Sequence, residues 1–262
     1  MGRTKLFLFE QFKINLTGIL RRIEKAYKVP QNMIKHPKFI LGVSGGPDSM
    51  AMLFLFYNLS LHKSMTLLVA HYNHMTRKEE SMRDEQFVID NCKKLNIEII
   101  TGRLQQKRII ANEEFLRNKR FAFFKSIVKK EQPCFLSLAH TKDDDIETVF
   151  INLLQGKILK PMLGINEFIK LPDTNSFLIH PLLNIGRDII LKFIMECDIP
   201  YVIDSSNLND IYLRNYVRHK IFSTFKTYKD SFFYSLESIK KIWHKIGKKL
   251  RQELLKHKIR NG

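Results

Sequence analysis

The sequence predicts an α/β fold built on a parallel sheet, and three observations support this prediction. Short, continuous apolar runs recur along the chain, and runs of this kind suit strands that are buried on both faces. Helix-like stretches separate the runs, so that strand and helix alternate about every thirty residues. Polar clusters follow the apolar runs, at the strand ends where such sheets bind ligands.

Four apolar runs give the predicted strands, and four helix-like stretches lie between or after them. The strands are residues 39–43, 65–70, 97–100 and 134–139, and the helices are residues 49–59, 81–95, 113–130 and 144–154. In the second helix, Phe87, Cys92 and Leu95 recur at helical spacing behind Ser81. This spacing predicts Ser81 as the N-cap of that helix.

The chain is predicted to have three parts. Residues 1–38 are a basic helical extension, residues 39–222 are the α/β domain, and residues 223–262 are a basic amphipathic helix. The last helix carries an apolar stripe that repeats every three or four residues: Phe232, Leu236, Ile239, Trp243, Ile246, Leu250 and Leu254. Its basic residues lie off the stripe and form either a solvated face or a contact with an RNA backbone.

The chain carries a strong positive charge. It has 44 Lys and Arg against 26 Asp and Glu, a formal net charge of +18. This excludes an acidic disordered chain and favours a polyanionic partner, either nucleic acid or an anionic membrane face. A compositional bias that enriches Lys, Ile, Phe and Asn is the alternative explanation for part of the excess.

The cysteines and the apolar runs indicate a cytoplasmic protein. Cys92, Cys134 and Cys197 are far apart and odd in number, which argues against a disulfide scaffold and a four-thiolate zinc site. No run approaches the roughly 18–20 apolar residues of a membrane span. The first residues lack the cleavage site of a signal peptide.

A glycine-rich turn joins the first predicted strand to the first helix. Ser44, Gly45, Gly46, Pro47, Asp48 and Ser49 form this turn. Glycines let backbone N–H groups approach an anion, and the helix N-terminus adds a partial positive charge. The turn therefore predicts a phosphate-binding loop, although it matches neither the Walker A pattern nor the dinucleotide-binding pattern.

Asp48 is the unusual residue of this loop. A carboxylate repels phosphate unless a cation lies between them, which favours Mg²⁺. The alternative is a plain strand-to-helix turn in which Asp48 caps the helix.

The loop resembles that of the PP-loop ATPases, which cleave ATP between the α- and β-phosphates, and later segments resemble the tRNA(Ile)-lysidine synthetase family. Residues 70–74 (AHYNH) and 139–148 (AHTKDDDIET) carry this resemblance, together with residues 180–183, 204–207 and 212–218. Thr141, Asp145 and His180 depart from the family pattern. The matching segments run from about residue 39 to 222, so the resemblance implies a Rossmann-like PP-loop ATPase domain there.

Several acids follow the fourth predicted strand. Asp144 and Glu147 are three residues apart and so share a helical face, with Asp143 beside them. Crowded carboxylates need a cation, either Mg²⁺ or the ammonium of a lysine substrate, and His140 could contact phosphate or nucleotide. The alternative is that the acids cap the helix.

Two arginines lie one turn apart on the helix at 113–130. Arg117 and Arg120 could face one anion, because the guanidinium fork donates parallel hydrogen bonds to phosphate. The alternative is a surface ion pair with Glu113 or Glu114.

The resemblance implies a two-step reaction that uses ATP, L-lysine and a tRNA(Ile) with a CAU anticodon. The carbonyl oxygen of the wobble cytidine attacks the α-phosphate of ATP, and the side-chain amine of lysine then displaces AMP. It assigns ATP binding to residues 44–49, His71 and Asn73, and tRNA or phosphate contacts to Arg214, Asn215 and Arg218. Asp144, before Glu147, is the expected acceptor of the lysine proton.

Two other functions compete with this one. A PP-loop tRNA thiolase would need paired cysteines for sulfur carriage or an iron–sulfur cluster, and the chain has none. A non-catalytic RNA-binding protein is disfavoured by the phosphate loop and the acids, because carboxylates repel a phosphate backbone.

Overall fold

The computed structural model describes residues 3–76, 78–105, 113–157, 164–203 and 213–224, with further positions between 231 and 253. The chain divides into two compact units. The first unit comprises Met1–Lys142 and Glu167–Asp204, and the second comprises Asp143–Asn166 and Ser205–Gly262. Among the described residues, no helix is long and apolar enough to cross a membrane.

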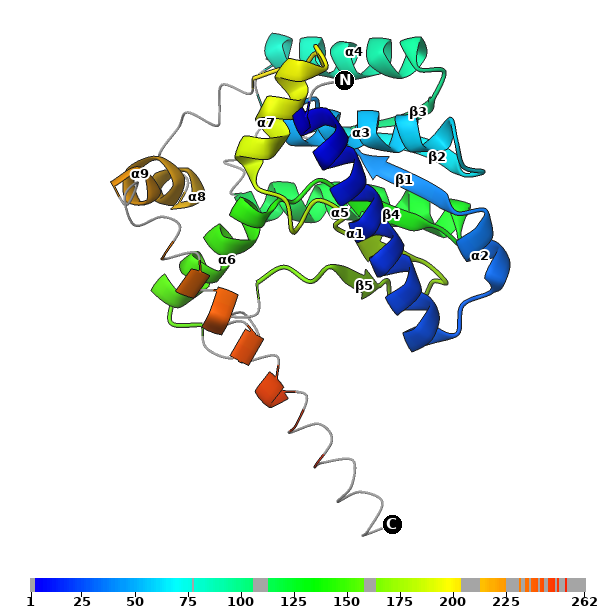
Figure 1. Ribbon diagram of the computed structural model, residues 1–262. Helices are drawn as coiled ribbons and strands as arrows, with labels where there is room; N and C mark the ends of the chain where they lie inside the picture. The colour runs from blue at the N-terminus through cyan, green and yellow to red at the C-terminus, as the bar shows by residue number, and fades with distance from the viewer. Residues whose placement is uncertain are drawn as a thin grey trace. The chain divides into compact units, whose positions relative to one another are not determined.

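The first unit is built on a six-stranded sheet, shown in Figure 1. Its strands are β1 (Lys38–Gly42), β2 (Thr66–Asn73), β3 (Glu98–Arg103), β4 (Phe135–Leu138), β5 (Phe168–Lys170) and β6 (Phe177–Ile179). The order is β3-β2-β1-β4-β6-β5, and every neighbouring pair is parallel except β5 with β6. The predicted parallel α/β sheet is confirmed, whereas β5 and β6 were not predicted.

Helices cover both faces of this sheet. Their bounds are α1 (Arg3–Tyr27), α2 (Gln31–Lys35), α3 (Pro47–Ser60), α4 (Lys78–Lys94), α5 (Glu113–Glu131) and α7 (Arg187–Glu196). Buried side chains of α1, α3 and α7 share one core cluster with Phe39 and Leu41 of β1. Ile40, whose side chain points to the opposite face, packs with Phe124 and Val128 of α5.

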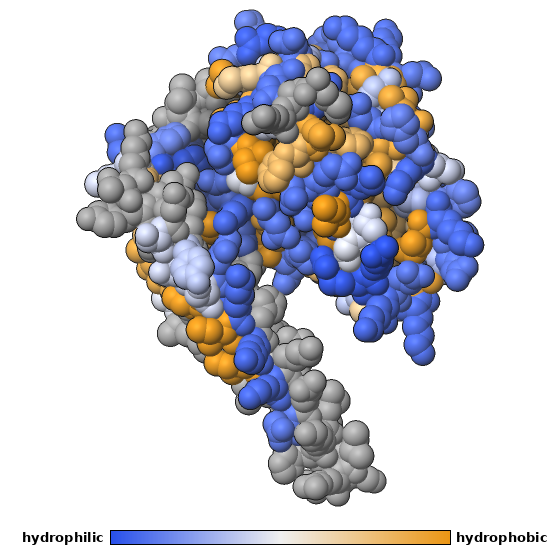
Figure 2. Space-filling model, in the orientation of Figure 1, coloured by the Kyte–Doolittle hydropathy of each residue, from blue (hydrophilic) through white to orange (hydrophobic). Residues whose placement is uncertain are grey.

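The N-terminal helix α1 is part of the core. Five of its side chains are almost completely buried: Leu8, Phe12, Leu16, Ile19 and Ile23. The rings of Phe12 and Phe56 meet edge to face, with centroids 5.0 Å apart. Figure 2 shows hydrophobic areas among hydrophilic ones on the visible face of the molecule. In α1 itself, Leu6, Phe7 and Ile14 are more than half exposed. The domain boundary at residue 38 stays a prediction, and this packing does not support a separate extension.

The helix α4 begins earlier than predicted. It starts at Lys78, so Ser81 lies inside the helix and the prediction of Ser81 as its N-cap was wrong. Glu79 and Glu80 lie in the first turn, where acidic side chains interact favourably with the helix dipole. These acids, and not the serine, mark the start of the helix.

The second unit is helical. It contains most of α6 (Lys142–Leu154), together with α8 (Leu213–Tyr216), a π-helix over Val217–Ile221 and α9 (Phe222–Thr224). Ile146 and Val149 of α6 pack against Val217 and Phe222. This small apolar cluster fixes the π-helix against α6.

The predicted C-terminal helix is described only in part. Ile239 and Ile246 of the predicted stripe are helical, and they are 37% and 42% exposed. The other members of the stripe, Phe232, Leu236, Trp243, Leu250 and Leu254, lie outside the described residues. The packing of the stripe, and the domain boundary at residue 222, therefore stay predictions.

Candidate functional site

The loop after β1 has the backbone geometry that a phosphate cradle needs. Gly45 has φ +94°, a region that residues with a side chain rarely adopt. A Cβ there would lie 2.9 Å from Cγ2 of Val202, whose N–H donates to the Gly45 carbonyl at 2.9 Å. The segment after α7 thus holds the loop closed, and only glycine fits the position.

Serine hydroxyls hold the loop from within. The Ser49 hydroxyl donates to the Gly46 carbonyl (2.9 Å), and the Ser44 N–H donates to Ser49 Oγ (3.1 Å). The two hydroxyl oxygens are 3.1 Å apart, so Ser44 supplies the proton of that contact. Gly46 is the N-cap of α3 and Pro47 its first helical residue. The loop is therefore already ordered at a helix N-terminus, which favours anion binding.

The loop lies at the point of the sheet where ligands are expected. From β1 the chain continues outward through β2 and β3, and it returns to the other side of β1 with β4. In open α/β sheets, such a change of direction is where ligands bind, at the carboxyl ends of the strands, here β1 and β4. The loop follows β1, and Ala139–Lys142 follows β4.

Asp48 forms an ion pair that the sequence did not predict. Arg187 donates to Asp48 Oδ2 from Nη2 (2.5 Å) and from Nε (3.1 Å). Both groups are largely shielded from solvent, with 13% of the Asp48 side chain and 28% of the Arg187 side chain exposed. The positive charge beside this carboxylate is thus supplied by the chain itself.

Asp48, the predicted Mg²⁺ ligand, fits the ion as one carboxylate among oxygen ligands from the nucleotide and water. Among the residues that the structure describes, no group of three or more His, Cys, Asp or Glu side chains could hold a metal. Mg²⁺ commonly binds one or two carboxylates together with substrate phosphates and water. Asp48 at a phosphate loop fits that donor set, with the nucleotide supplying the remaining oxygen ligands.

His71 is a buried neutral imidazole beside the loop. Its Nδ1 lies 2.8 Å from the Val43 carbonyl, which can only accept, so Nδ1 carries the proton. Burial lowers the pKa of His71 below its usual value, although the Val43 hydrogen bond acts in the opposite direction. The neutral ring fixes the backbone just before the loop.

The side chain of Asn73 forms hydrogen bonds within the protein through both its amide nitrogen and its amide oxygen. Its amide group donates to Glu85 Oε2 and to the Ser81 carbonyl, both at 2.8 Å, and its Oδ1 accepts from the Met75 N–H at 2.8 Å. Glu85 is almost fully buried and also accepts two bonds from Arg103 Nε. Burial would raise the pKa of Glu85, but the bonds from Arg103 and Asn73 lower it. The contact of Asn73 with ATP stays a prediction, and its observed role is to anchor the turn after β2.

The residues after β4 pack against the segment that follows β6. The rings of His140 and His180 meet edge to face, with centroids 4.7 Å apart. Thr141 is fully buried, and the Lys142 N–H donates to the Ile185 carbonyl at 3.0 Å. Two of the three departures from the family pattern, Thr141 and His180, therefore lie in the same buried region as His140.

In the second unit, one guanidinium joins the two predicted catalytic acids. Arg218 donates to Glu147 Oε1 from Nε and to Oε2 from Nη2, both at 2.7 Å. Its Nη2 also donates to Asp144 Oδ1 at 3.2 Å. The π-helix carries Arg218, and such helices often occur at functional sites. The structure brings Asp144 and Glu147 together, as their spacing predicts. The guanidinium that bonds to both belongs to Arg218, in the segment predicted to contact tRNA or phosphate.

Burial dominates the titration of Glu147. It raises the pKa of Glu147 above the usual value, although the hydrogen bonds from Arg218 act in the opposite direction.

The other predicted residues of this unit make local contacts. Arg214 donates to the Thr148 hydroxyl at 3.0 Å, and Asn215 is buried. Asp145 accepts from the Ile165 N–H at 2.6 Å, which gives this departure from the family pattern a local structural role.

The two arginines of α5 are in different environments. Arg117 is exposed and lies over the ring of Phe121, 5.7 Å from its centroid, whereas Arg120 is half-buried. Their contacts with ATP phosphates stay predictions. The predicted motif at Asp204–Asn207 and the residue Tyr212 lie outside the described residues.

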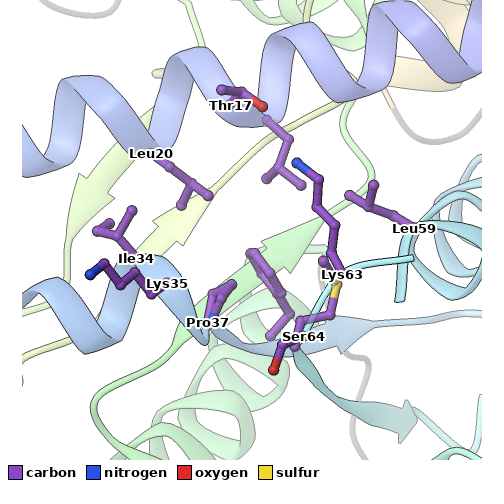
Figure 3. Close-up of a pocket in the computed structure, with 11 residues that line it drawn as sticks. Thr17, Leu20, Ile34, Lys35, Pro37, Leu59, Lys63 and Ser64 are labelled. Carbon is purple, nitrogen blue, oxygen red and sulfur yellow. The ribbon is translucent and has the colours of Figure 1, made fainter. Parts of the chain in front are cut away.

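A pocket of about 280 Å³ lies beside the amino ends of β1 and β2, opposite the strand ends that carry the phosphate loop (Figure 3). It is lined by Leu16, Thr17 and Leu20 of α1, Ile34 and Lys35 of α2, and Pro37, Phe39, Leu59, Lys63, Ser64 and Met65. Figure 3 shows Lys63 and Lys35 on opposite sides of its apolar floor. Phe39 is the second residue of β1 and Met65 precedes β2, so the pocket is at the amino ends of the strands and away from the phosphate loop.

Comparison with known families decides what kind of loop this is. A family model described as a PP-loop domain matches residues 17–225. The chain belongs to the PP-loop family. Membership implies the use of ATP, as the resemblance of the loop predicts.

Named relatives in this family are tRNA(Ile)-lysidine synthases. That of Caldanaerobacter subterraneus subsp. tengcongensis is 34% identical over 219 residues, which are 81% of this chain and 44% of the relative. That of Bacillus thuringiensis subsp. konkukian is 38% identical over 184 residues, which are 68% of this chain and 38% of the relative. The predicted resemblance is confirmed, and the matched part is less than half the length of either relative.

A solved structure confirms the fold. The U34-tRNA thiolase NcsA from Methanococcus maripaludis, with its [4Fe-4S] cluster, aligns with a TM-score of 0.67 and 17% identity. The alignment covers 89% of this chain and 80% of the thiolase chain. The predicted Rossmann-like PP-loop fold is therefore correct.

Proposed function

We propose that this chain is a cytoplasmic tRNA(Ile)-lysidine synthetase. It uses ATP to join L-lysine to the wobble cytidine of a tRNA(Ile) with a CAU anticodon. The observation that carries the proposal is the closed, glycine-turned loop at the carboxyl end of β1, in a chain 34–38% identical to named lysidine synthases. The unpaired wobble base can leave the anticodon stack at modest cost.

In the first step, the cytidine carbonyl oxygen attacks the α-phosphorus of ATP and pyrophosphate leaves. Backbone N–H groups of Gly45 and Gly46 and the N-terminus of α3 hold the leaving pyrophosphate, because they present partial positive charge to an anion. Asp48 would hold Mg²⁺, and the ion would supply positive charge for the leaving pyrophosphate. Arg117, Arg120 and His140 are proposed to contact the nucleotide or its phosphates.

In the second step, the side-chain amine of lysine attacks the activated ring carbon, AMP leaves, and the amine loses a proton. Asp144 and Glu147 are two carboxylates in one cluster, where Arg218 bonds to both and the charge of Arg214 also acts on Glu147. Carboxylates attract a cationic substrate, which suits the ammonium of lysine. A buried carboxylate whose pKa is raised, as at Glu147, is also a better proton acceptor for an amine. Arg214, Asn215 and Arg218 are proposed to contact the tRNA or its phosphates.

The test is AMP release by the purified chain with ATP, Mg²⁺, lysine and tRNA(Ile). Release should require both lysine and the tRNA, and it should stop when the wobble cytidine is replaced by uridine. Arginine in place of lysine serves as the amino-acid control. Release that continues without lysine, or with the uridine tRNA, would refute the proposal.

A further inference from the structure

We propose that Arg187 is a positioning residue that neutralises and orients Asp48, so that the phosphate loop can accept a polyanion. The inference concerns the same loop and rests on its proposed nucleotide role. It assigns a function to a residue outside every motif that identified the loop. The structural basis is the Arg187–Asp48 ion pair, which joins the first turns of α7 and α3.

The position of Arg187 in its own helix is unfavourable. It is the first residue of α7, where the helix dipole disfavours a cation. An arginine at this point is therefore accounted for by what it contacts and not by the stability of α7.

Packing fixes the guanidinium where it is. Ile190, Phe193 and Ile194 of α7 are buried in the core cluster that also contains Met50 and Leu53 of α3. In addition, the Lys142 N–H donates to the Ile185 carbonyl, two residues before Arg187. The arginine thus approaches Asp48 from a rigid support.

The ion pair with Arg187 reduces the negative charge that Asp48 presents to a phosphate in the loop. Asp48 is largely shielded from water, so its negative charge would act strongly on a phosphate in the adjoining loop. Arg187 offsets that charge and, through two bonds to Oδ2, sets the orientation of the carboxylate. Without Arg187 the Asp48 carboxylate would lose this guanidinium and repel the phosphates more strongly.

The experiment measures binding of inorganic pyrophosphate by calorimetry in EDTA, where no metal contributes. Arg187→Gln should weaken binding roughly tenfold or more, because the positive charge that pairs with Asp48 in the wild type is removed. Asp48→Asn should tighten binding, and the double variant should return close to the wild-type affinity. Arg187→Lys keeps the charge but loses the fork, and it should fall between wild type and Arg187→Gln.

Two controls separate this role from general effects. Arg22→Gln removes one positive charge from another pair of the same unit, Arg22–Glu167 at 2.8 Å, and should leave pyrophosphate affinity unchanged. Adenosine affinity should change in none of the variants, because it has no phosphate. Circular dichroism checks folding, and the double variant still tests the idea if Arg187→Gln folds poorly.

The outcomes are distinct. Equal pyrophosphate affinity in wild type and Arg187→Gln, or failure of Asp48→Asn to restore binding to Arg187→Gln, overturns the role of Arg187. Wild-type protein that does not bind pyrophosphate also overturns it. Normal pyrophosphate results without lysine-dependent AMP release would refute the proposed function and leave the role of Arg187 standing.

Discussion

The phosphate loop and the acid cluster solve the same electrostatic problem in different ways. In the loop, one carboxylate, Asp48, lies in a turn shaped by backbone geometry, and Arg187 pairs with it from 139 residues later in the chain. In the cluster, Asp144 and Glu147 share one helical face, and Arg218 pairs with both from 74 and 71 residues later. In both regions a local motif supplies the acids and a distant arginine supplies the compensating charge.

The difference lies in how the arginine is shared. In the loop, Arg187 bonds to a single carboxylate, and a glycine turn and a helix N-terminus adjoin this pair. In the acid cluster, Arg218 is shared by two carboxylates, and the charge of Arg214 also acts on Glu147. We propose phosphate as the ligand of the first region and the lysine amine as that of the second, and four predictions test this contrast.

The largest effect is expected at Asp144. Asp144→Asn should slow lysine transfer by about 10²–10⁴-fold, because proton acceptance by a positioned base contributes on this scale. Single-turnover measurements should show that formation of the adenylated tRNA is much less affected. Asp143→Asn, on the neighbouring residue, is the matched control and should change little. An equal loss in both variants would contradict the special role of Asp144.

Removal of Arg218 should destabilise the acid cluster. Arg218→Ala leaves two shielded carboxylates, 11% and 3% exposed, without their guanidinium, which should lower the free energy of unfolding by about 3–5 kcal/mol. Urea titration measures the change. Arg214→Ala removes one hydrogen bond to Thr148 and a weaker, through-space attraction to Glu147, and should cost less, about 0.5–1.5 kcal/mol. Similar losses in the two variants would show that the cluster does not depend on this guanidinium.

The stability of the phosphate loop should depend on glycine at position 45 and not at position 46. Gly45→Ala places a Cβ at φ +94° and 2.9 Å from Val202, and should lower the free energy of unfolding by about 1–3 kcal/mol. Gly46→Ala is the control, because Gly46 has an ordinary φ of −70° and its nearest contact is 3.6 Å away. Thermal melts compare the two. Greater damage from Gly46→Ala would show that the turn is not set by Gly45.

The smallest effect concerns pH and His71. Burial lowers the pKa of folded His71, whereas the unfolded chain keeps the usual value of 6.5. Below that value the unfolded state binds more protons, so His71 makes stability fall as the pH is lowered from 6.5 through the folded pKa. His71→Gln, which can still donate to the Val43 carbonyl, should flatten this part of the stability profile. An unchanged slope in urea titrations across this range would contradict the assignment.

Local pattern predicted the parts of the fold that have a strong periodic signal. The apolar runs at β1, β2 and β4 and the turn at residues 44–49 are contiguous in sequence, so their structure could be predicted directly. The strands β5 and β6 have only three residues each, too few for a period to appear. The helix α7 was also missed, although a glycine precedes it and apolar residues recur after its first two residues, Arg187 and Asp188.

The site was predictable where it depends on spacing and not where it depends on tertiary contact. The acids Asp144 and Glu147 were placed on one face because they are three residues apart. Arg187, Glu85 and Arg103 were missed, since nothing in the local sequence identifies the group that each of them contacts. A cation in the first turn of α7 was the one signal that could have identified Arg187.

The burial of α1 has a practical consequence for work with this protein. Each of its five core side chains contributes roughly 1.5–3 kcal/mol by leaving water, and a whole domain is stable by only about 5–15 kcal/mol. An expression clone trimmed to begin at β1 would therefore yield an insoluble or unfolded product. Fusion tags are best joined ahead of α1, with the complete helix retained.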